Sequence, residues 1–243
     1  MIFVVMRCQP LRRALAVRIN RYTYKKVYVM AREDDIKKIL EERDIRVLLH
    51  FTQLENLPNI LKEGIKTRDD LDEYAKCNDK LRLDNHTDTV SMSVHHPNDP
   101  MFYKYRTELK KENPKADWCI LGVPASILLE QDALFCKRNA ACSSISNKNE
   151  DELRKPESLE GMFEEIPGYI PRAEHCLKNN DPTDVQAEIL IKGTISPDKI
   201  KAIVFTSRQA KKDHQDLIGE RQTRIHAEKV TYLSRRDIQR KFK

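Results

Sequence analysis

Apolar residues along the chain follow two spacings, one typical of β-strands and one typical of α-helices. Short apolar and β-branched runs predict strands at residues 45–52, 89–95, 118–124, 132–136, 185–193 and 199–207, with a last one near residues 227–233. Helical spacing predicts helices at residues 32–43, 53–65 and 98–112, and a short helix or turn at 125–131. Gly64 closes the second of these helices. Six or seven short strands, not strictly alternating with helices, predict a mixed α+β domain.

The strand expected at residues 185–193 contains a carboxylate within an apolar pattern. Ala187, Ile189 and Ile191 share one face of this strand, while Glu188 and Leu190 share the other. Burying a carboxylate without partners is costly, so a Glu at this position indicates a functional group. The alternative is an edge strand whose Glu188 faces water, and the pattern alone leaves both open.

The longest polar stretch runs over residues 145–184 and contains Pro156, Pro167, Pro171 and Pro182. A loop of this length in a compact domain is usually functional or disordered. Residues 66–89 are also polar and predict a loop with little regular structure.

Positive charge is concentrated at the start of the chain. The net charge is +6, but residues 1–29 carry seven basic groups and no acidic one. Subtracting these seven from the 44 basic residues leaves 37 against 38 acidic residues, so the body is not a globally basic nucleic-acid binder. We expect residues 1–29 to be a basic extension, either a targeting peptide or arm, or untranslated sequence ahead of a start at Met30. We favour a start at Met30, with one domain over residues 30–243.

Composition excludes several classes of protein. The six cysteines show no CxxC pair and no spacing typical of zinc ligands, which favours reduced thiols in a cytoplasmic protein and no metal. The apolar runs are too short for a membrane-spanning helix. Neither GxGxxG nor GxxxxGK[ST] is present, so the Rossmann and P-loop modes of nucleotide binding lack their motifs.

Three groups of residues are candidates for chemistry. They are His50, Phe51 and Thr52 at the end of a strand, the turn at His95 and His96 before a group of aromatic residues, and Glu188. Each also has an ordinary explanation: a strand-end histidine with local hydrogen bonds, aromatic residues that belong to the core, or an exposed glutamate. Taken together in this order, they favour a functional set.

These segments resemble the DarT family of bacterial toxins, which are ADP-ribosyltransferases that modify single-stranded DNA. The resemblance runs from about residue 46 to about residue 235 and is strongest in LLHFTQLENLPNILKEGI, RLDNHTDTVSMSVHHPNDPMFYKYR and PTDVQAEILIKGTISPDKIKAIVF. It implies an ADP-ribosyltransferase fold of two small β-sheets around an NAD-binding cleft. It also implies a bacterial cytoplasmic enzyme that uses NAD⁺ as substrate, with single-stranded DNA and a DarG-type macrodomain antitoxin as partners and neither metal nor membrane.

The resemblance also implies roles for particular residues. Glu188 and Arg82 would be catalytic, although Arg68 and Arg106 compete with Arg82 for its role. The residues implied to bind NAD⁺ are His50, Phe51, Thr52, Phe102 and Tyr103. Those implied to bind DNA are Asn98, Met101, Arg106, Arg154 and Arg172. Residues 147–185 would form a variable loop that helps define the substrate.

The resemblance also bears on which DNA base is modified. The amino-acid sequence around SMSV, PN, MF and PTDVQAE resembles the family branch that modifies guanine more than the branch that modifies thymine. Lys104, Arg106, Lys110 and Lys111 lie beside the aromatic residues at 102, 103 and 105, a combination that suits an unpaired strand. Two alternatives stay open: an acceptor that is RNA or protein, and an inactive binding module with the same fold.

Overall fold

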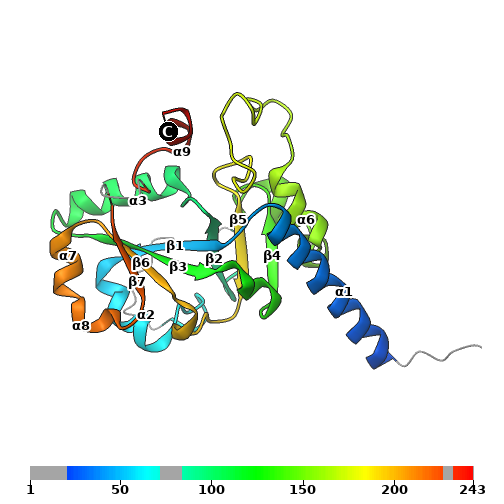
Figure 1. Cartoon of the computed structure of the whole chain (residues 1–243), viewed down its shortest axis with the longest axis horizontal. Helices are drawn as coiled ribbons and strands as arrows, with labels where there is room; N and C mark the ends of the chain where they lie inside the picture. The colour runs from blue at the N-terminus through cyan, green and yellow to red at the C-terminus, as the bar shows by residue number, and fades with distance from the viewer. Residues whose placement is uncertain (1–20, 72–83, 227–231, 243) are drawn as a thin grey trace, which may run out of the picture.

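The computed structural model describes residues 21–71, 84–226 and 232–242, with side chains from Met30 onward (Figure 1). The α-helices in these ranges are α1 (Arg21–Glu42), α2 (Leu57–Glu63), α3 (Asp99–Glu112), α4 (Ser143–Ser146), α5 (Glu150–Leu153), α6 (Pro156–Glu160), α7 (Arg208–Asp213), α8 (Gln215–Ile218) and α9 (Arg236–Lys241). The strands are β1 (Val47–Gln53), β2 (Thr89–Val94), β3 (Trp118–Pro124), β4 (Ala133–Cys136), β5 (Glu188–Lys192), β6 (Ala202–Phe205) and β7 (Gln222–Ile225). Short 3₁₀ turns include η1 (Leu54–Asn56), η2 (Ala125–Leu129), η3 (Gly161–Phe163) and η4 (Pro197–Lys199).

All seven strands form one mixed sheet in the order β4-β5-β2-β1-β3-β6-β7. Only the β6–β7 pair is parallel among the described strands. The α+β class is confirmed, but the expectation of two sheets is wrong. β1 and β2 pair at Leu48–Val94 and Leu49–Ser93, and these two pairs join what would otherwise be two sheets. Beyond them each strand follows its other neighbour, β1 pairing with β3 and β2 with β5.

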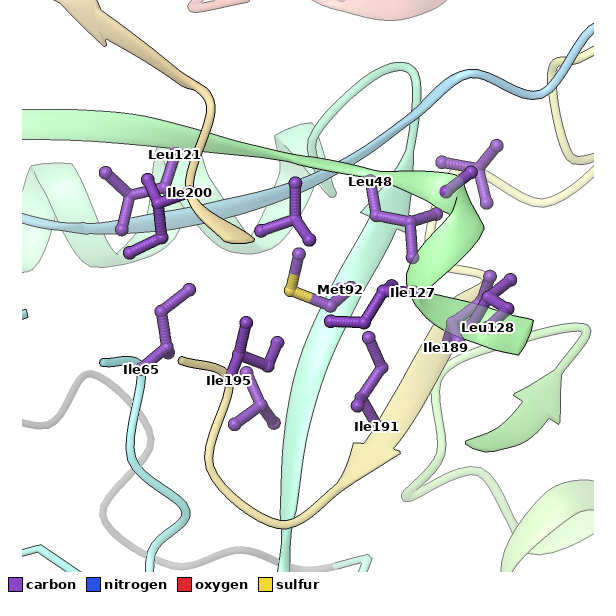
Figure 2. Packing of buried hydrophobic residues seen from close by; sticks show 14 of the residues in the cluster. Leu48, Ile65, Met92, Leu121, Ile127, Leu128, Ile189, Ile191, Ile195 and Ile200 are labelled. Atoms are coloured by element: carbon purple, nitrogen blue, oxygen red, sulfur yellow. The ribbon is translucent and has the colours of Figure 1, made fainter. Parts of the chain in front are cut away.

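One face of the sheet carries the main hydrophobic core (Figure 2). Leu48, Met92, Leu121, Ile189 and Ile191 point into it from strands β1, β2, β3 and β5. Helices and turns cover it with Ile36 and Leu40 of α1, Leu57 of α2, Ile127 and Leu128 of η2, and Leu159 of α6. The predicted alternation of β5 is confirmed here, because Ala187, Ile189 and Ile191 all belong to this core.

The opposite face carries two smaller apolar clusters. One covers β1, β3 and β6 and contains Leu49, Phe102, Trp118, Ile120 and Val204. The other covers β4 and β5 and contains Leu134, Cys136, Ala140, Ile145, Leu153 and Leu190. β2 lies between them, and its register with Leu49 and Leu190 places Ser93 and Ser91 on this face. A polar strip therefore separates the two clusters.

The end of α2 shows why glycine is needed where the sequence predicts a helix end. Gly64 has φ of 95°, in the left-handed region, and a Cβ there would lie 2.3 Å from the carbonyl oxygen of Ile195. The next residue, Ile65, pairs with Ile195 through an isolated β-bridge. Gly64 thus allows the chain to turn out of α2 and to pass close to the backbone of Ile195.

Several element boundaries differ from those expected. α1 begins at Arg21 rather than near residue 32, and residues 143–163 contain α4, α5, α6 and η3 where a loop was expected from residue 145. The strand expected near residues 227–233 falls mostly outside the described residues, while β7 and helices α7 to α9 lack the apolar periodicity that would predict them. None of the helices in the described ranges is long and apolar enough to cross a membrane.

Candidate active site

Glu188 is the first residue of β5 and faces the polar strip. β5 pairs with β4 on one side and β2 on the other, so the edge-strand alternative is wrong. One carboxylate oxygen accepts a hydrogen bond from the Ser91 hydroxyl, and the other accepts from the backbone N–H of Ala140, 2.7 Å away. Cys136 of β4 lies opposite Glu188, and the turn after Cys136 brings Ala140 to the carboxylate. Donors from two segments therefore fix the partly buried Glu188 side chain.

His50 lies on β1 where β1 and β2 diverge. Its Nδ1 is 3.0 Å from the backbone carbonyl oxygen of Ser91. Because a carbonyl oxygen only accepts hydrogen bonds, Nδ1 carries the proton in this contact. Ser91 therefore contacts both candidates, accepting from His50 through its backbone and donating to Glu188 through its side chain. The structure brings His50 and Glu188 to one place with a single residue between them.

Phe51 and Thr52 extend this end of β1. The hydroxyl of Thr52, which is buried, accepts a hydrogen bond from the side-chain amide of Asn56 at 3.0 Å. The ring of Phe51 stacks on Phe102, with ring centroids 4.6 Å apart. Phe102 is only 1% exposed and also meets Trp118 edge-on, so its ring belongs to the core. Tyr103, the other ring expected to pack on nicotinamide, is 67% exposed.

The beginning of α3 adjoins the polar strip. Asn98 caps this helix, accepting a hydrogen bond from the backbone N–H of Met101 at 3.3 Å. Its own backbone N–H donates to the hydroxyl of Ser93 at 3.1 Å, which ties the start of α3 to β2. One turn beyond Phe102, the Arg106 guanidinium lies 5.3 Å from the Phe102 ring centroid, and burial lowers the pKa of Arg106.

The expected arginines have different surroundings. Arg82 lies outside the described residues, while its competitor Arg68 is described and partly buried. Arg154 forms ion pairs with Asp132, Glu150 and Asp151 at 2.7–2.9 Å. Asp132 precedes β4, at the opposite end of that strand from Glu188, so the structure does not bring Arg154 to Glu188.

Arg172 is bound within its own loop. It donates to the backbone oxygens of Asp181 and Lys178 and to the hydroxyl of Thr183, at 2.7–2.9 Å. These bonds close residues 172–183 into a compact unit. The C-terminal part of this expected loop is therefore held in a defined conformation.

Sequence reasoning missed Ser91, Ser93 and a cluster beside the Ala140 turn. In that cluster Tyr169 donates to Asp184 at 2.9 Å, and Arg138 lies 3.5 Å from the same carboxylate. The Arg138 guanidinium also lies 5.1 Å from the Tyr169 ring centroid. Only the basic pair in the CKRNAA stretch hinted at this cluster, because its members are far apart in sequence.

One group in the described part of the chain has the composition of a metal site. Donor atoms of His86, Asp88 and Glu150 lie within 4.8 Å of one another. However, the Lys192 ammonium already lies 2.8 Å from Asp88 and 2.9 Å from Glu150. Hydrogen bonds and charge from Lys192 lower the pKa values of both carboxyls against the opposing effect of burial. This lysine supplies the positive charge that a cation would bring.

The geometry around Glu188 suits chemistry at an electron-poor carbon. A fixed carboxylate can stabilise positive charge that develops next to it without reorganising during the reaction. The neighbouring His50 and the buried hydroxyl of Thr52 offer polar contacts for a ligand, and the start of α3 adjoins the strip through the contact of Asn98 with Ser93.

Comparisons with known proteins point to one family. A family model described as "ssDNA thymidine ADP-ribosyltransferase, DarT" matches residues 49–233, whereas a search of curated protein sequences gave no match. Since the family description names thymidine, the expected preference for guanine is not supported.

Solved structures share the fold at low sequence identity. Thermus sp. 2.9 DarT in complex with ADP-ribosylated ssDNA is 15% identical with a TM-score of 0.52, covering 74% of this chain and 93% of its own. The same protein in complex with carba-NAD⁺ is 16% identical with a TM-score of 0.50 and the same coverage. Thermosipho africanus DarTG in complex with ADP-ribose is 16% identical with a TM-score of 0.51, covering 77% of this chain and 51% of its own.

Proposed function

Because this chain belongs to the DarT family of NAD-dependent ssDNA ADP-ribosyltransferases, we propose that it transfers ADP-ribose from NAD⁺ to thymine bases of single-stranded DNA. The observation that carries the proposal is the contact of Ser91 with both His50 and Glu188. Through Ser91, a carboxylate and an imidazole, each with a defined hydrogen-bond partner, lie one residue apart. Two of the residues singled out by the sequence thus share one site.

In the proposed reaction Glu188 accepts a hydrogen bond from the ribose 2′-hydroxyl of NAD⁺. The bond between nicotinamide and the anomeric carbon breaks, and nicotinamide leaves with the electron pair. The carboxylate stabilises the positive charge left on the anomeric carbon. A ring nitrogen of the base forms the new bond to this carbon, and its N–H proton passes to water.

Around Glu188, the surrounding residues hold the two substrates. His50 hydrogen-bonds a ribose hydroxyl, and Thr52 contacts the nicotinamide end. The exposed ring of Tyr103 is the aromatic face available for stacking, since Phe102 is buried by Phe51 and Trp118. NAD⁺ is the substrate that supplies the ADP-ribose, and the proposed chemistry uses no metal ion.

We propose residues 30–243 as the catalytic domain and a DarG-type macrodomain protein as its partner. α1 joins the main core through Ile36 and Leu40, both beyond Met30. The match to Thermosipho africanus DarTG supports the partner, because this chain covers about half of that longer protein.

The test is incubation with NAD⁺ and single-stranded oligonucleotides that each lack one base, read by mass spectrometry. We expect a mass shift on every oligonucleotide except the one without thymine. Labelling that depends on guanine would overturn the choice of base. Labelling of RNA or protein only would favour a different acceptor, and no labelling of any acceptor would favour an inactive module.

A further inference from the structure

Helix α9 begins just beyond residues 49–233, the range that the family model matches. Its first residue, Arg236, donates its backbone N–H to the Asp99 carboxylate at 2.8 Å and its guanidinium to the carbonyl oxygen of Thr183 at 3.2 Å. One turn later, Arg240 donates two hydrogen bonds to the two oxygens of Asp181, at 2.6 and 2.7 Å. α9 thus binds two separate segments through two arginines.

These contacts are buried. Asp181 is 0% exposed and Arg236 is 5% exposed. Burial alone would raise the pKa of Asp181, but hydrogen bonds from Arg240 and the Lys178 N–H outweigh it, so the pKa is lowered and the carboxylate stays ionised. A two-point arginine–carboxylate pair holds geometry as well as charge. By contrast, the side chain of Arg235, the N-cap residue of α9, is 70% exposed and pairs with Asp237 in the first turn of the helix.

The two segments joined by α9 flank the polar strip. Asp99 opens α3 directly after Asn98, which contacts Ser93 of β2. Asp181 and Thr183 belong to the stretch that leads into Glu188. Figure 1 shows α9 between α3 and the loop that precedes β5. The hydrogen bonds of Arg236 and Arg240 thus connect the start of α3 to the stretch before β5.

Glu188 is held by different contacts. Ser91 and Ala140, which donate hydrogen bonds to its carboxylate, belong to β2 and to the turn after β4. Neither α9 arginine contacts these two residues in the described structure. The position of the carboxylate is therefore expected to survive changes in α9, whereas the placement of α3 and of the 172–183 segment is not.

We propose that Arg236 and Arg240 are positioning residues for the DNA substrate, an inference that rests on the proposed function. They hold the start of α3, which carries Met101, against the segment closed by Arg172. α9 thereby sets the spacing between the two sides of the acceptor site and leaves cleavage of NAD⁺ to Glu188.

The experiment separates these two steps. Arg240→Met leaves the buried Asp181 carboxylate without its charged partner and threatens folding. The key variant is therefore Arg240→Met combined with Asp181→Asn, which removes both charges. Arg240→Lys keeps the charge but loses the two-point geometry, and Arg235→Met removes an exposed arginine at the N-cap of α9 as a matched control. Each protein is measured for kcat and KM on single-stranded DNA, for NAD⁺ hydrolysis without DNA, and for Tm.

For the double variant we expect kcat/KM on DNA to fall roughly tenfold or more, chiefly through KM, while NAD⁺ hydrolysis stays within about twofold. Arg240→Lys should recover part of the loss, and Arg235→Met should match the wild type. Wild-type DNA transfer by a folded double variant would overturn the inference, as would a parallel fall in NAD⁺ hydrolysis. If the wild type hydrolyses NAD⁺ but labels no DNA, the proposed function fails first and this inference fails with it.

Discussion

Replacing Glu188 with glutamine removes the charge of the carboxylate with little change in its shape. The Gln oxygen can still accept from the Ala140 N–H, and its amide can donate to the Ser91 hydroxyl, which turns to accept. The exchange of one hydrogen-bond direction should cost no more than about 1 kcal/mol of stability. Glu188→Ala is less clean, because it leaves the Ala140 N–H without this acceptor, at a cost of about 1–3 kcal/mol.

The effect on catalysis should be much larger. Glu188 is partly buried, and at an effective dielectric constant of about 20 a unit charge about 4 Å from it is stabilised by about 4 kcal/mol. The reacting carbon carries only part of a unit charge, so the loss should be somewhat smaller. Removal of one such stabilising group typically lowers kcat by a factor of about 10²–10³. We expect a fall of this size in DNA modification.

The assay measures the rate of mass shift on a thymine-containing oligonucleotide at saturating NAD⁺, with Tm recorded for each protein. Ser91→Ala is the matched control, since it removes a hydrogen-bond donor but keeps the Glu188 charge and the backbone carbonyl that holds His50. It should lower the rate by roughly tenfold or less. A folded Glu188→Gln variant that keeps more than about a tenth of wild-type activity, a barrier change of only about 1.4 kcal/mol, would refute the catalytic role.

Three further predictions follow from the same structure. A chain starting at Met30 should be folded and active, because it keeps Ile36 and Leu40 in the core; loss of activity with the fold intact would instead support a DNA-binding arm. The same oligonucleotide should be modified when single-stranded and hardly at all when annealed to its complement, since residues 30–243 have almost no net charge; equal labelling at equal salt would point to base flipping. The lowered pKa of Asp181 should contribute stability that is complete above its ordinary pKa of 3.8 and is lost as the pH falls through the lower folded value. Denaturant unfolding between about pH 5 and pH 2 should therefore show a shallower loss for Asp181→Asn than for the wild type, and equal slopes would contradict the assignment.

The sequence predicted the parts of this protein that depend on neighbours along the chain. The alternation in β5, with Ile189 and Ile191 in the core and Glu188 on the opposite face, follows from the two-residue period of a strand. The end of α2 at Gly64 follows from the backbone freedom of glycine. The family resemblance rests on the same local segments, so it could be recognised without a structure.

The pairing of distant segments could not be predicted in this way. Two residue pairs between β1 and β2 decide that there is one sheet rather than two, and no local pattern encodes so short a ladder. The same holds for charged residues: the loop arginines Arg154 and Arg172 look alike in sequence, yet the first is bound by three carboxylates and the second by its own loop. Which partner a charge finds depends on where the packed chain places the alternatives.

The site itself shows the same division. His50 and Glu188 were identifiable as residues, but Ser91, which contacts both, gave no signal because a serine in a strand is unremarkable in sequence. It lies 41 residues from His50 and 97 from Glu188. Arg240 and its partner Asp181 are likewise 59 residues apart. Local periodicity reports only neighbours within a few positions, so residue types and faces could be predicted from the sequence, whereas these contacts exist only once hydrophobic burial has packed β1, β2, β5 and α9 together.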